Sequence, residues 1–453
     1  MDRILVPFEG EGSGEAPLTW GQMGLWQSIQ ESGESRTVGG VSLLPPTFTV
    51  EDMVGTLAFM MGRHQALRSR LRFEPDGTPR QVLSTSGEVP LEVVDAGDAD
   101  PAGVAEEIFQ RHQRVPFDYE HEWPVRMAVI RSGGILTHLV AVYLHLALDA
   151  TGMTILIGDA AARDPVTGEA APVTATPPLE QARRQAGPAA RRQNEASLRH
   201  FENVLRTVPA SRFGEPRYDV EPSWQEVRFR SPATLLAARA AAARGESNTS
   251  SVLLASFAVA LARFTDRNPV MTLVMVSNRF RPGFAQSVSA VAQISPIMID
   301  VADATISEAV ARAGRGALNA YKSAYYNPYE QDDVVELVTR DRGEEIDFSC
   351  YYNDRRQSDR EQAEGPVPTE REIRDALARS SHVWENDPEM SRAKLYLHVD
   401  DPPGAIDFVL STDARWFSAD DTLAFARAME AVAVDAALDP TAATGVRSVP
   451  APV

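Results

Sequence analysis

The chain has 453 residues, with 63 Asp and Glu against 44 Lys and Arg, and a formal net charge of −19. This acidic balance argues against nucleic acids and anionic membranes as partners. No run of 18 uncharged apolar residues is present, and the N-terminus lacks the apolar segment of a signal peptide, so we expect a cytoplasmic protein. The single cysteine, Cys350, excludes internal disulfides and cysteine-based metal clusters.

A chain of this length exceeds one ordinary hydrophobic core, so we expect two lobes. Residues 165–178 are rich in Pro, Thr and Ala, which is typical of a connection between folded parts. The sequence therefore predicts an N-terminal lobe over 1–178 and a C-terminal lobe over 179–453.

In the first lobe, residues 1–16 resemble a loose lead-in. Thr49 can cap an amphipathic helix that runs to about His64, and 105–113 predict another helix. Residues 125–130 and 136–148 predict two strands. Ser132-Gly133-Gly134 between them indicates a hairpin, with a helix following from about Thr151.

In the second lobe, strands and helices again alternate, which favours an α+β or mixed α/β fold. Residues 355–391 are charged and irregular and predict a loop or crossover. The predicted helices are 179–205, 251–264, 306–321 and 421–438, and the predicted strands are 269–276, one that ends at 299–301, 346–351, 394–399 and 405–411.

His145 and Asp149 have the spacing His-x-x-x-Asp at the end of the second hairpin strand. Alternation along that strand predicts that His145 shares a face with Tyr143. The N-terminus of the next helix, near Ala150 and Thr151, offers backbone N–H groups to a developing oxyanion. On spacing alone, a hydrogen-bonded histidine in the core is the more frequent explanation.

Several further segments accompany this pair in a fixed order along the chain. They are Leu18-Thr19-Trp20-Gly21-Gln22 with Trp26, Arg63-His64-Gln65-Ala66-Leu67-Arg68, Pro116-Phe117-Asp118 with Pro124-Val125-Arg126, Ser277-Asn278-Arg279 with Arg281-Pro282, Gln293-Ile294-Ser295-Pro296, Tyr326-Asn327-Pro328-Tyr329-Glu330 and Asp347-Phe348-Ser349. In this order they resemble the condensation domains of nonribosomal peptide synthetases, which are relatives of chloramphenicol acetyltransferase.

The resemblance implies two acetyltransferase-like lobes of mixed α/β structure that form a V-shaped pseudo-dimer with a central tunnel. The donor would be an acyl or aminoacyl thioester on the phosphopantetheine arm of an acyl or peptidyl carrier protein. The acceptor would be a small-molecule amine or hydroxyl. No bound cofactor and no metal are implied. The chain would be free-standing and would meet its carrier proteins in trans.

The resemblance also assigns roles to residues. His145 corresponds to the catalytic second histidine of His-His-x-x-x-Asp-Gly, and Asp149 to its structural acid. We expect Asp149 to form a buried ion pair with Arg63 or Arg68, although either arginine could instead bind carrier phosphate at the surface. The residues expected to line the tunnel are Tyr143, Gln293 and Ser295.

Three positions depart from the family pattern. Leu144 replaces the first histidine, but alternation points its side chain to the other face of the strand. Ala150 replaces a glycine and would be strained if the backbone there needed a positive φ. The segment 293–297 also differs from the usual strand.

The sequence leaves three main functions open, with an epimerase as a fourth. The first is a condensation enzyme that forms an amide or ester. The second is an acyltransferase that uses acyl-coenzyme A or a polyketide carrier with an alcohol. The third is a recruitment module that has kept the fold and lost the reaction.

Overall fold

The computed structural model describes residues 2–164, 167–244, 247–356, 365–385 and 393–448. The chain divides into two compact units. The first contains Met1–Asn194, Ser277–Gln293 and Asn327–Tyr329, and the second contains Glu195–Val276, Ile294–Tyr326 and Glu330–Val453. The boundary predicted after residue 178 is based on composition alone. In the structure, the first unit continues to Asn194 and also includes two segments from later in the chain.

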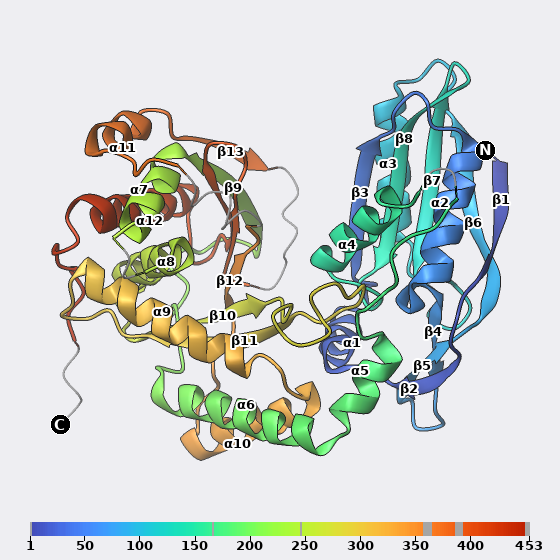
Figure 1. Cartoon of the computed structure of the whole chain (residues 1–453). Coiled ribbons are helices and arrows are strands. Elements are labelled where there is room, and N and C mark those ends of the chain that lie inside the picture. The colour runs from blue at the N-terminus through green and yellow to red at the C-terminus, as the bar shows by residue number, and fades with distance from the viewer. Residues whose placement is uncertain (1, 165–166, 245–246, 357–364, 386–392, 449–453) are drawn as a thin grey trace. The chain divides into compact units, whose positions relative to one another are not determined.

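The first unit has a five-stranded sheet in the order β1-β6-β7-β8-β3 and a three-stranded sheet in the order β2-β5-β4 (Figure 1). The strands are β1 Asp2–Glu9, β2 Gly14–Pro17, β3 Thr37–Leu43, β4 Ser69–Phe73, β5 Pro79–Leu83, β6 Ser86–Asp95, β7 Val125–Ser132 and β8 Ile135–Leu144. The helices are α1 Trp20–Ser32, α2 Val50–Arg63, the 3₁₀ helix η1 Gln65–Arg68, α3 Pro101–Arg114, α4 Ala150–Ala161 and α5 Pro178–Gln185.

Alternation along β7 explains how the five-stranded sheet is covered. Met127 and Val129 lie in one apolar cluster with residues of α2, whereas Ala128 and Ile130 lie in another with residues of α3. Because successive side chains of a strand point to opposite faces, α2 and α3 cover opposite faces of the sheet. The predicted helix beginning after Thr49 is confirmed, since the Thr49 side chain caps α2.

The predicted hairpin is also confirmed, because β7 and β8 pair antiparallel. Gly133 and Gly134 both have positive φ, the conformation that a tight hairpin turn needs. Strand β8 ends at Leu144, earlier than predicted, and α4 begins at Ala150. The hairpin therefore delivers His145 to the segment between a strand and a helix.

The expectation of a loose lead-in over residues 1–16 is wrong, since β1 and β2 lie there. Strand β1 pairs antiparallel with β6 along its whole length. Its alternate residues Val6 and Phe8 are buried. A proline and the acidic residues around these few apolar positions hide the period of two in the sequence.

The second unit is built on a seven-stranded sheet in the order β11-β10-β12-β14-β15-β9-β13. In Figure 1 the helices α7, α8, α9 and α12 lie together on one face of this sheet, where the largest apolar cluster forms. The elements are β9 Trp224–Ser231, α7 Pro232–Ala242, α8 Thr249–Thr265, β10 Val270–Val276, α9 Ile306–Ser323, β12 Cys350–Asp354, α11 Glu370–Leu377, β13 Ser381–Glu385, β14 Leu395–Asp400, β15 Ile406–Asp413 and α12 Ala419–Leu438.

Three elements include residues of both units: α6 Pro188–Thr207, β11 Gln293–Ile299 and α10 Pro328–Arg342. The mixed α/β class is confirmed. The expectation of an irregular segment over 355–391 is wrong where α11 and β13 lie, while 357–364 and 386–392 fall outside the described residues.

Candidate functional site

His145 follows β8 directly and is held through its backbone and its ring. Its backbone N–H donates to the carbonyl oxygen of Arg36 at 2.8 Å, and its side chain is half-buried. The ring Nδ1 lies 3.1 Å from the carbonyl oxygen of Leu148. A carbonyl oxygen can only accept, so Nδ1 carries the hydrogen of this bond. In the neutral ring, Nε2 is then the atom with a free lone pair, which is the arrangement of a general base.

Asp149 is buried, with 5% of its surface exposed, and it caps α4. Its Oδ1 accepts from the backbone N–H of Gly152 at 2.7 Å and also from the guanidinium of Arg279. Its Oδ2 faces the backbone N–H groups of Val291 and Ala292, at 3.2 and 3.3 Å. Four donors therefore surround this one carboxylate.

Arg279 connects the carboxylate to the chain segment that follows it. Its guanidinium donates to the carbonyl oxygens of Phe284, Ser287 and Ser289 in addition to Asp149. We call Asp149, Arg279 and the segment 284–292 the carboxylate clamp. The clamp joins the N-terminus of α4 to a segment more than one hundred residues later, and it does so within the first unit.

The expected pairing of Asp149 with Arg63 or Arg68 is wrong. Arg63 donates instead to Asp159 at 2.8 Å and to the carbonyl oxygen of Ala171 at 2.7 Å. Arg68 is buried, and its guanidinium donates to the backbone carbonyl oxygens of Glu11, Gly12 and Ser84.

Arg279 takes the place predicted for these arginines because the returning segment brings it to α4. The sequence does carry a signal here, because Arg279 belongs to the Ser-Asn-Arg segment already associated with the motif. Its neighbour Asn278 adopts a positive φ of 57°, which Asn tolerates better than most residues.

The helix end beside Asp149 is regular. Ala150 is the first residue of α4 and is absent from the residues with positive φ, so the backbone strain considered for this alanine does not arise. Ala150 and Thr151 are both exposed. The carboxylate of Asp149 accepts from the N–H of Gly152 and from neither Ala150 nor Thr151. The backbone N–H groups of Ala150 and Thr151 are therefore not capped by Asp149.

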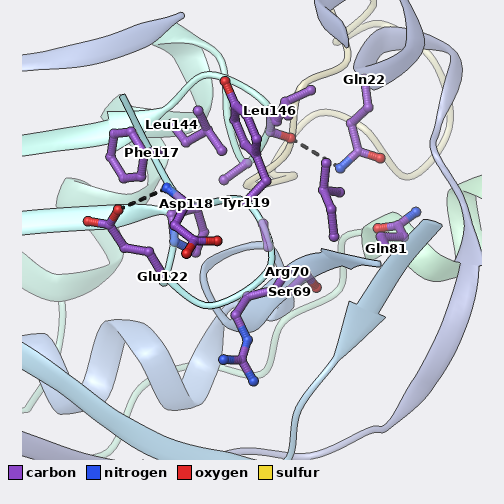
Figure 2. Close-up of a pocket in the computed structure, with 14 residues that line it drawn as sticks. Gln22, Ser69, Arg70, Gln81, Phe117, Asp118, Tyr119, Glu122, Leu144 and Leu146 are labelled. Atoms are coloured by element: carbon purple, nitrogen blue, oxygen red, sulfur yellow. Dashed lines mark hydrogen bonds between the residues drawn. The ribbon is translucent and has the colours of Figure 1, made fainter. Parts of the chain in front are cut away.

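Leu144 is buried on the face of β8 opposite Tyr143. It packs with Phe117 and Leu146 in one apolar cluster, while Tyr143 belongs to another. Figure 2 shows Leu144 and Leu146 beside Phe117 and Tyr119 on the wall of a small pocket. The predicted placement of Leu144 and Tyr143 on opposite faces is confirmed. The predicted shared face of His145 and Tyr143 is not established, because β8 ends before His145.

The residues expected to line a tunnel are all buried. Tyr143 is 2% exposed within the apolar core of the first unit, and burial raises the pKa of its phenol well above the usual value. Gln293 and Ser295 lie on β11 and are 7% and 0% exposed. The Ser295 hydroxyl has no hydrogen-bond partner among the described residues. Their role along a tunnel stays a prediction.

Within the described ranges, no group of three or more His, Cys, Asp or Glu side chains is arranged to hold a metal ion. None of the helices in those ranges is both long enough and apolar enough to cross a membrane.

Comparison with known proteins gives one family and a set of similar structures. The sequence profile of the condensation domain matches residues 13–444. A search of curated proteins finds no match.

Three of these structures are informative. The first condensation domain of the calcium-dependent antibiotic synthetase, in complex with a substrate analogue, is 14% identical with a TM-score of 0.69, over 96% of this chain and 98% of that one. The X-domain in its complex with OxyB from teicoplanin biosynthesis is 16% identical with a TM-score of 0.73, over 98% of each chain. A mutant starter condensation domain of rhizomide synthetase RzmA, in complex with C8-CoA, is 14% identical with a TM-score of 0.69, over 95% and 96%.

Proposed function

Because this chain belongs to the condensation-domain family, we propose that it transfers an acyl or aminoacyl group from a carrier-protein thioester to an amine or hydroxyl acceptor. The substrate would arrive on the phosphopantetheine arm of its carrier, and the product would be an amide or an ester. Acyl transfer in biosynthesis is the activity general to the family. The donor, the acceptor and the carrier are the specific parts of this proposal.

The observation that carries the proposal is the contact of His145 Nδ1 with the carbonyl oxygen of Leu148, from which the tautomer of the ring follows. With Nδ1–H donated to Leu148, Nε2 can accept the proton of an attacking amine or hydroxyl. The acceptor nitrogen or oxygen forms a bond to the thioester carbonyl carbon, and the carbon–sulfur bond then breaks. The proton taken by Nε2 passes to the departing sulfur, so the histidine returns to its starting state.

The uncapped N–H groups of Ala150 and Thr151 supply a second element. They lie at the N-terminus of α4, where the helix dipole favours negative charge. In this proposal they stabilise the oxygen of the tetrahedral intermediate. Asp149 acts at a distance, because its oxygens are occupied by the carboxylate clamp; it positions α4 and touches no substrate.

The demand on His145 depends on the acceptor. An α-amine, with an unperturbed pKa of about 8, is partly unprotonated near neutral pH and needs little help from a base. A hydroxyl is far less acidic than an ammonium and depends much more on Nε2. We therefore expect loss of the imidazole to reduce ester formation more severely than amide formation.

The test uses carrier proteins loaded with acyl groups, a panel of amine and hydroxyl acceptors, and intact-protein mass spectrometry. We expect His145→Gln to lose about 10²–10⁴-fold in transfer rate, the usual contribution of general acid–base catalysis. The matched control is His138→Gln on β8, the strand that ends directly before His145; the ring of His138 contacts the Thr137 hydroxyl. Transfer that is equally fast in both variants would count against the assignment of His145.

Two alternatives have support of their own. The complex of RzmA with C8-CoA favours a coenzyme A thioester as donor, and loading the acyl group on coenzyme A instead of a carrier tests this. The complex of the X-domain with OxyB, together with Leu144 in the motif, favours a recruitment module. Binding of a carrier or an oxygenase without transfer to any acceptor would support this last function.

A further inference from the structure

A pocket in the first unit does not have His145 in its lining and takes no part in the acyl transfer proposed above. Its volume is about 520 Å³, which is large enough for a small organic molecule. Gly62, Arg63, His64, Gln65 and Arg68 at the end of α2 and in η1 form one wall. The other wall comes from the segment 172–178 and from Ser287 and Val288. We call it the Arg68 pocket.

Arg68 gives this pocket a buried positive charge. Only 1% of its surface is exposed, and its Nη atoms donate to backbone carbonyl oxygens rather than to a carboxylate. Its Nε has no hydrogen-bond partner in the described part of the chain. Burial destabilises this cation more than the nearby carboxylate of Glu11 stabilises it, so the pKa of Arg68 is lowered. A second anion would compensate the desolvated charge.

The charges around Arg68 reinforce this preference. Arg63 also lines the pocket, while Glu11 is the one acidic residue that does. Arg63 is paired with Asp159 through its Nε, and its Nη2 donates to the carbonyl oxygen of Ala171. The lining therefore carries a net positive charge on a chain whose net charge is −19.

His64 adds a polar group without adding charge. It is 5% exposed, and its Nε2 has no hydrogen-bond partner among the described residues, although Asp159 Oδ2 lies 3.4 Å away. Burial lowers the pKa of the imidazole to about 4, so the ring is neutral near pH 7. A neutral ring nitrogen can still exchange a hydrogen bond with a ligand.

We propose that the Arg68 pocket binds a small organic anion, whose carboxylate or phosphate faces Arg68, Arg63 and His64 and whose apolar part packs against Val173 and Val288. Pro172, Pro177 and Pro178 extend this apolar wall. The proposal is independent of acyl transfer, since it concerns binding at a different place in the first unit.

Occupancy of this pocket should stabilise the first unit. The pocket residue Ser287 also supplies a carbonyl oxygen to Arg279 in the carboxylate clamp. A ligand that binds only the folded protein raises its melting temperature as its concentration exceeds the dissociation constant. Thermal unfolding is therefore a direct readout that needs no substrate or carrier.

The experiment titrates the purified full chain with octanoate, octyl phosphate and the neutral octanamide, following melting temperature and heat of binding. We expect saturable binding of octanoate or octyl phosphate that weakens with added salt, and no binding of octanamide. Comparison of the two anions decides between carboxylate and phosphate. Equal binding of octanamide, or no saturable binding of either anion, would overturn the proposal.

A pair of matched variants locates the binding. Val173 is 47% exposed at the pocket, so Val173→Glu adds a negative charge without disturbing a core. We expect it to weaken binding about tenfold or more, because like charges at close range repel strongly. Val220→Glu, at a residue that is 48% exposed in the second unit, should leave binding unchanged. Equal affinity in these two variants would show that the anion binds elsewhere and would refute the assignment.

Discussion

Replacing Asp149 by Asn tests whether this residue serves architecture or chemistry. The amide keeps the size of the carboxylate but loses its charge and turns one acceptor into a donor. If its oxygen stays with Gly152 and Arg279, its NH₂ group must face the N–H groups of Val291 and Ala292. In the variant, the donor NH₂ group therefore faces two donor N–H groups inside the clamp, and Arg279 loses its counter-charge.

The structure sets the size of the effect. The exposed fraction of the two side chains is 8% for Asp149 and 11% for Arg279, so the pair counts as buried. Removing one partner of a buried ion pair lowers the free energy of unfolding by roughly 3–5 kcal/mol. We add no separate loss for the weakened helix cap, because the cap and the ion pair use the same carboxylate atoms. For a unit of about 200 residues this corresponds to a fall in melting temperature of roughly 6–20 °C.

The assay combines thermal unfolding with acyl transfer measured well below the melting transition. Asp95→Asn is the matched control, because Asp95 forms a two-fold hydrogen-bonded pair with Arg131 but its side chain is 55% exposed. We expect no measurable change in its melting temperature, as is usual for surface pairs. A soluble Asp149→Asn protein with an unchanged melting temperature and abolished transfer would refute the structural role.

Three further predictions follow from other parts of the structure. Leu144→His, which restores the usual family residue, should lower the unfolding free energy by roughly 1–3 kcal/mol without raising transfer, because it puts a polar ring into an apolar cluster; faster transfer would contradict this. Burial lowers the pKa of His64 to about 4 and of His398 to about 3, so both resist protonation when folded. Their contribution to the free energy of unfolding is therefore complete above about pH 6.5 and is lost as the pH falls towards 4, by roughly 3 kcal/mol for His64 alone. Replacing either residue by Gln should flatten the curve of melting temperature against pH. Curves that run parallel for the variant and the wild type would argue against this. Gly21→Ala should cost about 1–3 kcal/mol, since its Cβ would lie 2.2 Å from a backbone oxygen of the clamp segment, whereas Gly24→Ala, with 3.7 Å to its nearest neighbour, should be tolerated in the same denaturant titration.

The sequence by itself determined the local features of the site. A turn with two glycines specifies the β7–β8 hairpin, and Thr49 followed by Asp52 specifies the start of α2, because both depend on residues a few positions apart. The order of the motif segments identified the family and, with it, the mixed α/β fold. The same order of segments identifies His145, directly after β8, as the candidate catalytic residue.

Only the tertiary structure decided which residue pairs with Asp149 and which strand pairs with β1. The sequence offered two arginines for Asp149, and the structure supplies Arg279, because the segment after β10 returns to the first unit and no local pattern encodes such a contact. Strand β1 likewise owes its existence to pairing with β6, since its own apolar positions are too few to predict a strand. Helix caps and turns depend on neighbours in sequence, whereas ion pairs and edge strands depend on residues brought together only by folding.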